Sequence, residues 1–173
     1  MGNSGLWVAV LTAVTAIAAS WVTSRGNTQA ARVQALAAAD AQHLATLRAS
    51  QREAYLAFIE QINTMGIHYR ETPAILEITD ADERRTALVS HLAEIREAYG
   101  LFLRQLSVVT LDGPRAPRAA ADAVDASSTT VYKTLLAISE GSQPTEAFAP
   151  TVVAYWETAT DFVHAAREAR DGQ

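Results

Sequence analysis

The chain contains no cysteine among its 173 residues, which excludes disulfide bonds and thiolate chemistry. Glycine and proline are scarce, at 8 and 5 residues, and they fall mostly between segments of helical pattern. No segment alternates apolar and polar residues in the way that a half-buried β-strand does. Together these absences favour an all-α protein in a compartment that need not be oxidising.

The sequence also lacks the short motifs of common enzymes. It has no P-loop, no glycine-rich dinucleotide motif, no H-E-x-x-H zinc motif and no nucleophile elbow. The net charge is −5, and acidic and basic residues are interspersed along the chain. That balance argues against a nucleic-acid partner and against polybasic binding to anionic lipid. We therefore expect neither a cofactor nor a catalytic activity.

The N-terminal stretch is uncharged over residues 2–24 and most apolar over residues 5–24. As a helix, the uncharged stretch would measure about 34 Å, enough to cross a hydrocarbon core about 30 Å thick. Trp7 and Trp21 stand near its two ends, where indole rings prefer the membrane interface. The sequence therefore predicts a transmembrane helix within residues 1–27, a cell-membrane location and a lipid bilayer as partner.

The charges that flank this stretch predict its orientation. Arg25, at the interface, and Arg32 follow the span, whereas no basic residue precedes it. The positive-inside rule then places the N-terminus outside and the C-terminal domain in the cytoplasm. The alternative is a cleaved signal peptide with a small-residue site at Ala16-Ile17-Ala18, which would give an extracytoplasmic protein.

Small residues repeat every four positions within the predicted span, at Thr12, Ala16 and Ser20. Such a stripe lets transmembrane helices approach closely and favours self-association. Alanine is abundant throughout this chain, however, and that abundance is the simpler explanation of the stripe.

After the span, the sequence predicts a helical stalk over residues 28–43 and an antiparallel four-helix bundle over residues 44–173. The bundle helices are expected at about 44–70, 80–107, 117–139 and 149–170, each with apolar residues at coiled-coil-like spacings of three and four. The stalk residues have no helix of matching length to pack against. We expect them to form a spacer about 24 Å long or a surface that pairs with another copy.

The spacing also predicts which residues face the core. They are Tyr55, Phe58, Ile62, Met65 and Tyr69; then Leu88, Leu92, Ile95, Tyr99, Phe102 and Leu106; then Ala120, Val124, Ser128, Val131, Leu135 and Ile138; and finally Phe148, Val152, Tyr155, Ala159, Phe162 and Ala166. Pro73 is expected to end the first helix, and Asp80 to cap the second.

Two carboxylate–histidine pairs are the metal-ligand candidates that the sequence offers. Asp40 with His43, and Asp161 with His164, have the i, i+3 spacing found in di-iron bundles. Those sites use inward-facing Glu-x-x-His and two further glutamates, which are missing here, so solvated surface pairs are the simpler interpretation. His91 lies beside the core position Leu92 and is expected on the flank of its helix.

Two stretches of the sequence resemble the corresponding parts of a known group of proteins. An apolar start followed by an Ala/Arg-rich helix that reaches Arg52-Glu53-Ala54-Tyr55-Leu56-Ala57-Phe58 is similar to uncharacterised actinobacterial membrane-anchored helical proteins. The turn Val109-Thr110-Leu111-Asp112-Gly113-Pro114 before an alanine-rich helix fits the same layout. The resemblance implies an anchor and a bundle, and it implies no activity.

The sequence thus predicts a non-catalytic, single-pass membrane protein. Its bundle would act on the cytoplasmic face as a scaffold that binds an unknown protein partner, or another copy through the span or the stalk. The alternative is an extracytoplasmic helical sensor or surface module, and a helical-bundle metal enzyme comes third.

Overall fold

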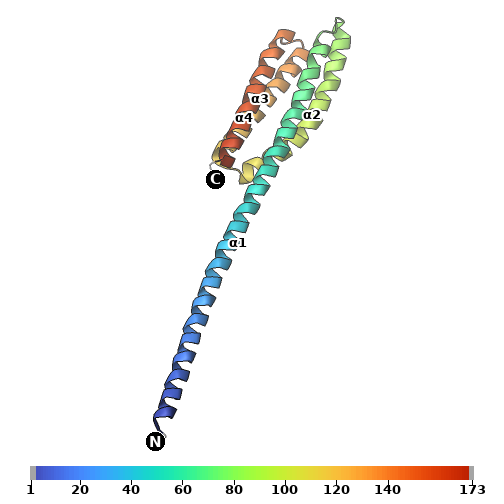
Figure 1. Cartoon of the computed structure of the whole chain (residues 1–173). Coiled ribbons are helices and arrows are strands. Elements are labelled where there is room, and N and C mark those ends of the chain that lie inside the picture. The colour runs from blue at the N-terminus through green and yellow to red at the C-terminus, as the bar shows by residue number, and fades with distance from the viewer. Residues whose placement is uncertain (1–2, 172–173) are drawn as a thin grey trace. The chain divides into compact units, whose positions relative to one another are not determined.

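The computed structural model describes the backbone of residues 3–171 and the side chains of residues 31–111 and 113–171. Its elements are α1 (Asn3–Leu76), α2 (Ala81–Asp112), α3 (Arg115–Ser139), a short 3-10 helix η1 (Thr145–Ala147) and α4 (Phe148–Asp171), as Figure 1 shows. No β-strand occurs in the backbone of residues 3–171. The prediction of an all-α chain with four bundle-forming helices is confirmed.

The chain divides into two compact units, Met1–Leu47 and Arg48–Gln173. In the first unit, every side chain that the structure describes, from residue 31 to residue 47, is exposed. The second unit contains the hydrophobic core and all four helices of the bundle, with α1 contributing its residues from 48 onward.

Most residues that the spacing predicted to face inward are buried. They are Tyr55, Phe58, Ile62, Met65 and Tyr69 of α1; Leu88, Leu92, Ile95, Phe102 and Leu106 of α2; Val124, Ser128, Val131, Leu135 and Ile138 of α3; and Phe148, Tyr155, Ala159, Phe162 and Ala166 of α4. Tyr99, Ala120 and Val152 are only partly buried and pack at the edge of the core. In α3 the core position is Ala121, one residue further on, because the three- and four-residue spacing runs through Ala121 to Val124.

Neighbouring helices run antiparallel. Along each pair of helices, the residue numbers of the contacting residues increase on one helix and decrease on the other. The pairs are Tyr55–Phe162 and Tyr69–Tyr155 between α1 and α4, Phe58–Phe102 and His68–His91 between α1 and α2, and Arg96–Tyr132 and Tyr99–Asp125 between α2 and α3. The short connections between consecutive helices require the same arrangement.

The start of α2 is fixed by a side-chain cap. Asp80 Oδ1 accepts hydrogen bonds from the backbone N–H groups of Asp82, at 2.9 Å, and Glu83, at 2.8 Å. These are N–H groups that the first turn of a helix leaves without intrahelical partners. The predicted capping role of Asp80 is confirmed.

The expected end of the first helix near residue 70 was wrong, because α1 continues through Pro73 to Leu76. Proline removes one backbone hydrogen bond from the helix, but a side-chain hydrogen bond and buried apolar side chains stabilise the surrounding turn. Thr72 is fully buried, and its Oγ1 donates to the carbonyl oxygen of His68 at 3.0 Å. Ile75 and Leu76 pack against the core, so tertiary burial outweighs the local preference of proline.

Two other helix boundaries also differ from the prediction. The predicted span and the predicted stalk meet at Gly26 and Asn27, but the backbone of α1 is helical through both residues, since one helical glycine costs only about 1 kcal/mol. Helix α2 extends beyond residue 107 to Asp112, because Val109 adds one more buried position to its inward face.

The predicted transmembrane span at residues 5–24 lies outside the residues whose side chains the structure describes. Among the residues that it does describe, no helix has an apolar stretch long enough to cross a bilayer.

Gly66 provides a test of the packing between α1 and α4. A Cβ atom at Gly66 would lie 2.3 Å from Cζ2 of Trp156, whereas a Cβ at Gly100 in α2 would meet nothing within 4 Å. We expect Gly100→Ala to stabilise the bundle by about 0.5–1 kcal/mol through helix propensity. Gly66→Ala should instead destabilise it by about 1 kcal/mol, because overpacking against the Trp156 ring exceeds that gain.

Chemical denaturation followed by circular dichroism measures both changes in the free energy of unfolding. Equal stabilisation by the two alanines would contradict the close approach of Trp156 to Gly66.

Candidate functional site

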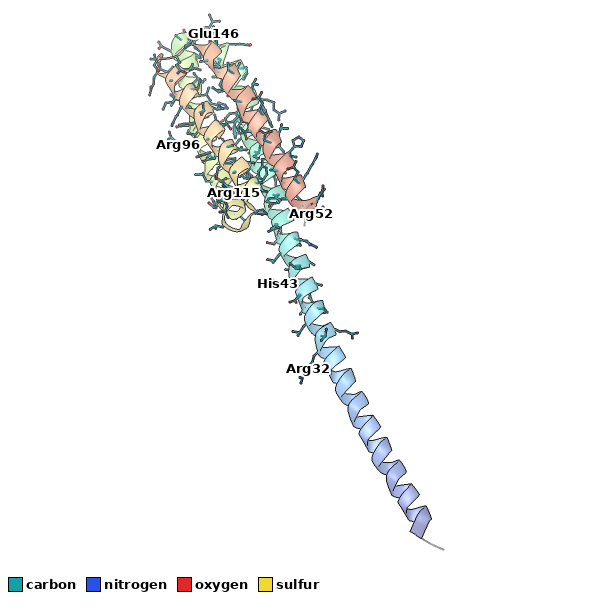
Figure 2. The ribbon with its side chains drawn as sticks, turned by 90° about the vertical axis from the view of Figure 1, so that its left-hand side faces the viewer. Arg32, His43, Arg52, Arg96, Arg115 and Glu146 are labelled. Carbon is teal, nitrogen blue, oxygen red and sulfur yellow. The ribbon has the colours of Figure 1, made fainter. Side chains whose placement is uncertain are left out.

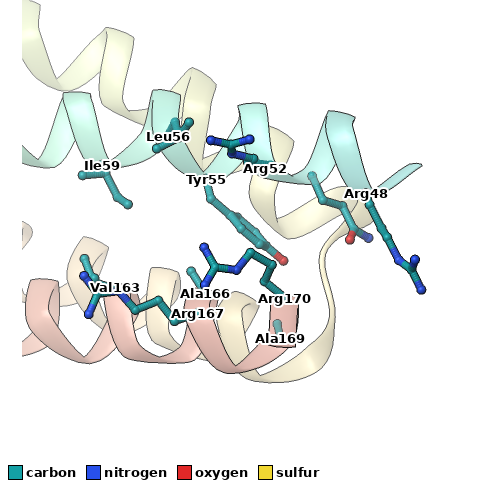
Figure 3. Close-up of a pocket in the computed structure, with 11 residues that line it drawn as sticks. Arg48, Arg52, Tyr55, Leu56, Ile59, Val163, Ala166, Arg167, Ala169 and Arg170 are labelled. Atoms are coloured by element: carbon teal, nitrogen blue, oxygen red, sulfur yellow. The ribbon is translucent and has the colours of Figure 1, made fainter. Parts of the chain in front are cut away.

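A groove lies between α1 and the C-terminal turns of α4 in the second unit. Its volume is about 280 Å³. Figure 3 shows the side chains of α1 on one side and those of α4 on the other. It is lined by Arg48, Gln51, Arg52, Tyr55, Leu56 and Ile59 of α1 and by Val163, Ala166, Arg167, Ala169 and Arg170 of α4.

The groove is strongly basic, although the whole chain carries a net charge of −5. Its four charged residues are arginines, and no aspartate or glutamate belongs to its lining. Arg170 Nε donates to Asp171 Oδ1 at 2.9 Å, so part of its charge is compensated. Arg52 and Arg167 are exposed, and within the described part of the chain the structure shows no ion pair for either. These two guanidinium groups therefore provide the available positive charge.

The Tyr55 ring forms the inner wall of the groove. It extends from α1 toward α4, as Figure 3 shows, and packs edge-on against Phe162 with ring centroids 6.0 Å apart. The Tyr55 hydroxyl is buried and has no hydrogen-bond partner among the described residues. A second cavity of about 30 Å³, which Ser50 and Gly113 help to line, lies beside Tyr55. Burial raises the pKa of Tyr55, so its hydroxyl stays neutral at physiological pH.

This arrangement is suited to binding an anion that carries an apolar group. Arginine presents a planar set of donors that matches carboxylate and phosphate oxygens. The apolar wall formed by Leu56, Ile59 and Val163 would cover the rest of such a ligand. The lining consists of arginine, glutamine, tyrosine and apolar side chains, which can hold an anion through charge and hydrogen bonds.

The sequence-predicted metal candidates lie on exposed surfaces. Asp40 and His43 are exposed in the first unit, where Figure 2 shows His43 on the helix surface, and Asp161 and His164 are exposed on α4. Among the described residues, neither pair meets a third histidine, aspartate or glutamate with ligand atoms close enough to share a metal ion.

The other predicted site residues lie outside the residues whose side chains the structure describes. They are Trp7, Trp21 and Arg25 at the expected membrane interfaces, and Thr12, Ala16 and Ser20 of the small-residue stripe.

The prediction from the sequence did not identify two features of the bundle. His91 was expected on a flank, but it is buried at 4% exposure between α1 and α2. The groove was missed because Arg52 and Arg167 are far apart in sequence and each has the pattern of a solvated helix residue. Only the antiparallel packing of α1 and α4 brings them to one surface.

The fold defines the class of this protein as an all-α helical bundle, and the basic groove between α1 and α4 is a candidate binding surface on it. Comparisons with protein-family models, with curated proteins and with solved structures find no match.

The groove makes a testable prediction about anion binding. We expect 1-naphthyl phosphate, which joins a phosphate to an apolar ring, to bind the full chain, and uncharged 1-naphthol to bind much more weakly. The double substitution Arg52→Gln, Arg167→Gln should reduce the affinity for 1-naphthyl phosphate about tenfold or more, since hydrogen bonds to charged groups contribute about 1.5–3 kcal/mol.

Fluorescence titration measures both affinities. Arg104→Gln, an exposed arginine on α2 outside the groove, is the matched control and should leave binding unchanged. An equal loss in the control would show that the anion responds only to overall charge.

Proposed function

We propose that this protein is a non-catalytic, single-pass membrane protein whose helical bundle acts as a scaffold and whose stalk, extended here to Leu47 at the end of the first compact unit, pairs with the stalk of another copy. The supporting observation is an unpartnered apolar stripe on α1. Its members, Val33, Leu36, Leu44 and Leu47, are 62%, 67%, 51% and 46% exposed. Large apolar residues gathered on one exposed face of a helix are a candidate interaction surface.

The four residues of the stripe share one face of the helix. At about 100° per residue, their spacing of three, eight and three places them within an arc of about 80°. The opposite face carries Ala31, Ala38 and Ala45. The large apolar residues are thus concentrated on one side, as in a helix that packs against a partner.

The spacing favours a second copy of the same chain as that partner. Val33 and Leu44 are eleven residues apart, and so are Leu36 and Leu47. An eleven-residue repeat keeps a stripe on the facing sides of two helices that wind around each other in a right-handed supercoil. Anchoring two copies in one bilayer would align them in parallel and raise their local concentration, which supports pairing through a small surface.

Asp40 lies near the centre of the same arc, between Leu36 and Leu44. A polar residue at a helix–helix interface lowers stability and restricts the register of pairing. We therefore infer a weak parallel pair that depends on the shared membrane. The bundle would then carry the basic groove, where Arg52 and Arg167 supply the contacts to an acidic protein partner.

The membrane location and the orientation rest on the sequence. Residues 5–24 are long and apolar enough for a span, and Arg25 and Arg32 follow it on the side proposed as cytoplasmic. The resemblance to actinobacterial membrane-anchored helical proteins supports the same layout.

Cysteine cross-linking tests the pairing, because the chain has no native cysteine. In a parallel pair, identical positions on the stripe face each other. We expect Leu36→Cys and Leu44→Cys to form intermolecular disulfides in membranes, whereas Ala38→Cys and Ala45→Cys on the opposite face should not.

Asp40→Leu should increase the cross-linking yield of Leu44→Cys, since it removes a charge from the proposed interface. The pairing is refuted if all four positions react equally or if none reacts.

Labelling of a single cysteine tests the orientation. In cells that carry Gln173→Cys, a membrane-impermeant maleimide should react only after the membrane is permeabilised. Reaction in intact cells would contradict the cytoplasmic placement and would support the outward-facing alternative.

A further inference from the structure

A buried histidine links α1 to α2 near the loop that joins them. His91 Nε2 lies 3.0 Å from the carbonyl oxygen of His68 and 3.0 Å from Oγ1 of Thr72. Thr72 Oγ1 uses its own hydrogen to donate to the same carbonyl, also at 3.0 Å. Both neighbours of Nε2 therefore present acceptor oxygens to it.

These contacts determine the tautomer of His91. A carbonyl oxygen can only accept a hydrogen bond, so Nε2 must carry the hydrogen and donate it. In the neutral ring, Nδ1 is then an unprotonated nitrogen with a free lone pair. Because the side chain is buried, this lone pair has little access to water.

Nδ1 of His91 lies in a cluster of possible metal ligands. It lies 3.5 Å from Oε2 of Glu94, whose side chain is 58% exposed. A ligand nitrogen of His68 belongs to the same cluster, in which the three ligand atoms all lie within 4.8 Å of one another. Nδ1 of His68 is also buried and has no hydrogen-bond partner among the described residues. Two imidazole nitrogens and a carboxylate oxygen thus lie close together, and this set of electron-pair donors favours a bound cation.

We propose that His68, His91 and Glu94 bind a divalent transition-metal ion of the Zn²⁺ class. Two imidazoles and one carboxylate form a common donor set for Zn²⁺, with a fourth position left open. The hydrogen bond from His91 Nε2 to the His68 carbonyl is the outer contact that typically fixes the tautomer and orientation of a metal-bound histidine.

The geometry requires only a small adjustment. Ligand atoms on a tetrahedral Zn²⁺ ion lie about 3.3 Å apart, given bonds of about 2.0–2.1 Å, so the three side chains must move inward by about 1 Å. The exposed Glu94 side chain is free to make this movement. Glu71 Oε2, 4.0 Å from His68 Nδ1, is close enough to occupy the fourth position after a rotation.

The site would stabilise the α1–α2 hairpin. Its histidines come from different helices, so the metal would add a bridge between two elements that also meet through apolar contacts and through the hydrogen-bond contacts of His91 with Thr72 and with the carbonyl oxygen of His68. Binding to the folded state alone raises stability in proportion to the logarithm of the free metal concentration. This role is independent of the proposed membrane anchor and stalk pairing.

Titration of the purified full chain with Zn²⁺ tests the proposal. We expect saturable binding of one ion per chain, a higher melting temperature with Zn²⁺, and a visible spectrum of low-symmetry coordination with Co²⁺. Glu94→Gln and His68→Ala should each weaken Zn²⁺ binding about tenfold or more, while both variants keep a helical circular dichroism spectrum without metal.

Glu97→Gln, an exposed residue one turn along α2, and His164→Gln on α4 are matched controls that should bind Zn²⁺ like the parent chain. His91→Gln is the less suitable variant, because it also removes a buried hydrogen bond. The absence of stoichiometric binding, or binding that is unchanged in both Glu94→Gln and His68→Ala, would overturn the proposal. Loss of binding in His164→Gln alone would do the same.

Discussion

The contacts of the Phe58 ring hold the bundle in register. Phe58 is fully buried, and its ring centroid lies 5.0 Å from that of Phe102 in α2 and 4.9 Å from that of Phe162 in α4. Aromatic pairs of this kind contribute about 0.5–1.5 kcal/mol each beyond the burial of their surface. One side chain thus fixes α1 against two neighbours, and sliding α1 along the bundle would break both contacts at once.

Two buried hydroxyl groups make this register specific. Tyr155 donates to the carbonyl oxygen of Ile62 at 2.7 Å, and Tyr69 is hydrogen-bonded to Ser128 at 2.7 Å. Burial raises the pKa of both tyrosines, so they remain neutral and keep their hydrogens. A shifted packing would leave these polar groups buried without partners, which is expensive in a low-dielectric core. The aromatic contacts provide stability, and the hydroxyl groups select one arrangement.

The same register creates both candidate binding sites. Tyr55 precedes Phe58 by one turn of α1. Together with Arg52 it lines the groove from the α1 side, opposite α4. His68 follows Phe58 by about three turns and meets His91 on α2. Neither site could exist on an isolated helix, because each needs groups from two helices. The packing of the core therefore positions both candidate sites as well as stabilising the fold.

The sequence predicted what depends on spacing within one helix and missed what depends on contact between helices. Phe58, Ile95 and Tyr155 were placed in the core because apolar residues recur every three or four positions. The end of α1 was missed, since the local effect of Pro73 is overridden by burial of Thr72 against α2. The arginine groove and the histidine cluster were missed for the same reason: no local motif shows that Arg52 meets α4 or that His68 meets His91.

The apolar residues of the stalk also show that spacing within one helix predicts an apolar face but not what covers it. The eleven-residue spacing of Val33 and Leu44 leads on to Tyr55, yet Tyr55 is buried and the first two are exposed. The pattern that predicts a covered face is thus present in both places, but the chain itself covers only the face that carries Tyr55. An exposed leucine alone needs no explanation, because folded proteins show many. Four large apolar residues within one arc of a helix, opposite a face of alanines, are the observation on which the proposed pairing rests, and a second copy is the proposed partner because its spacing is the same.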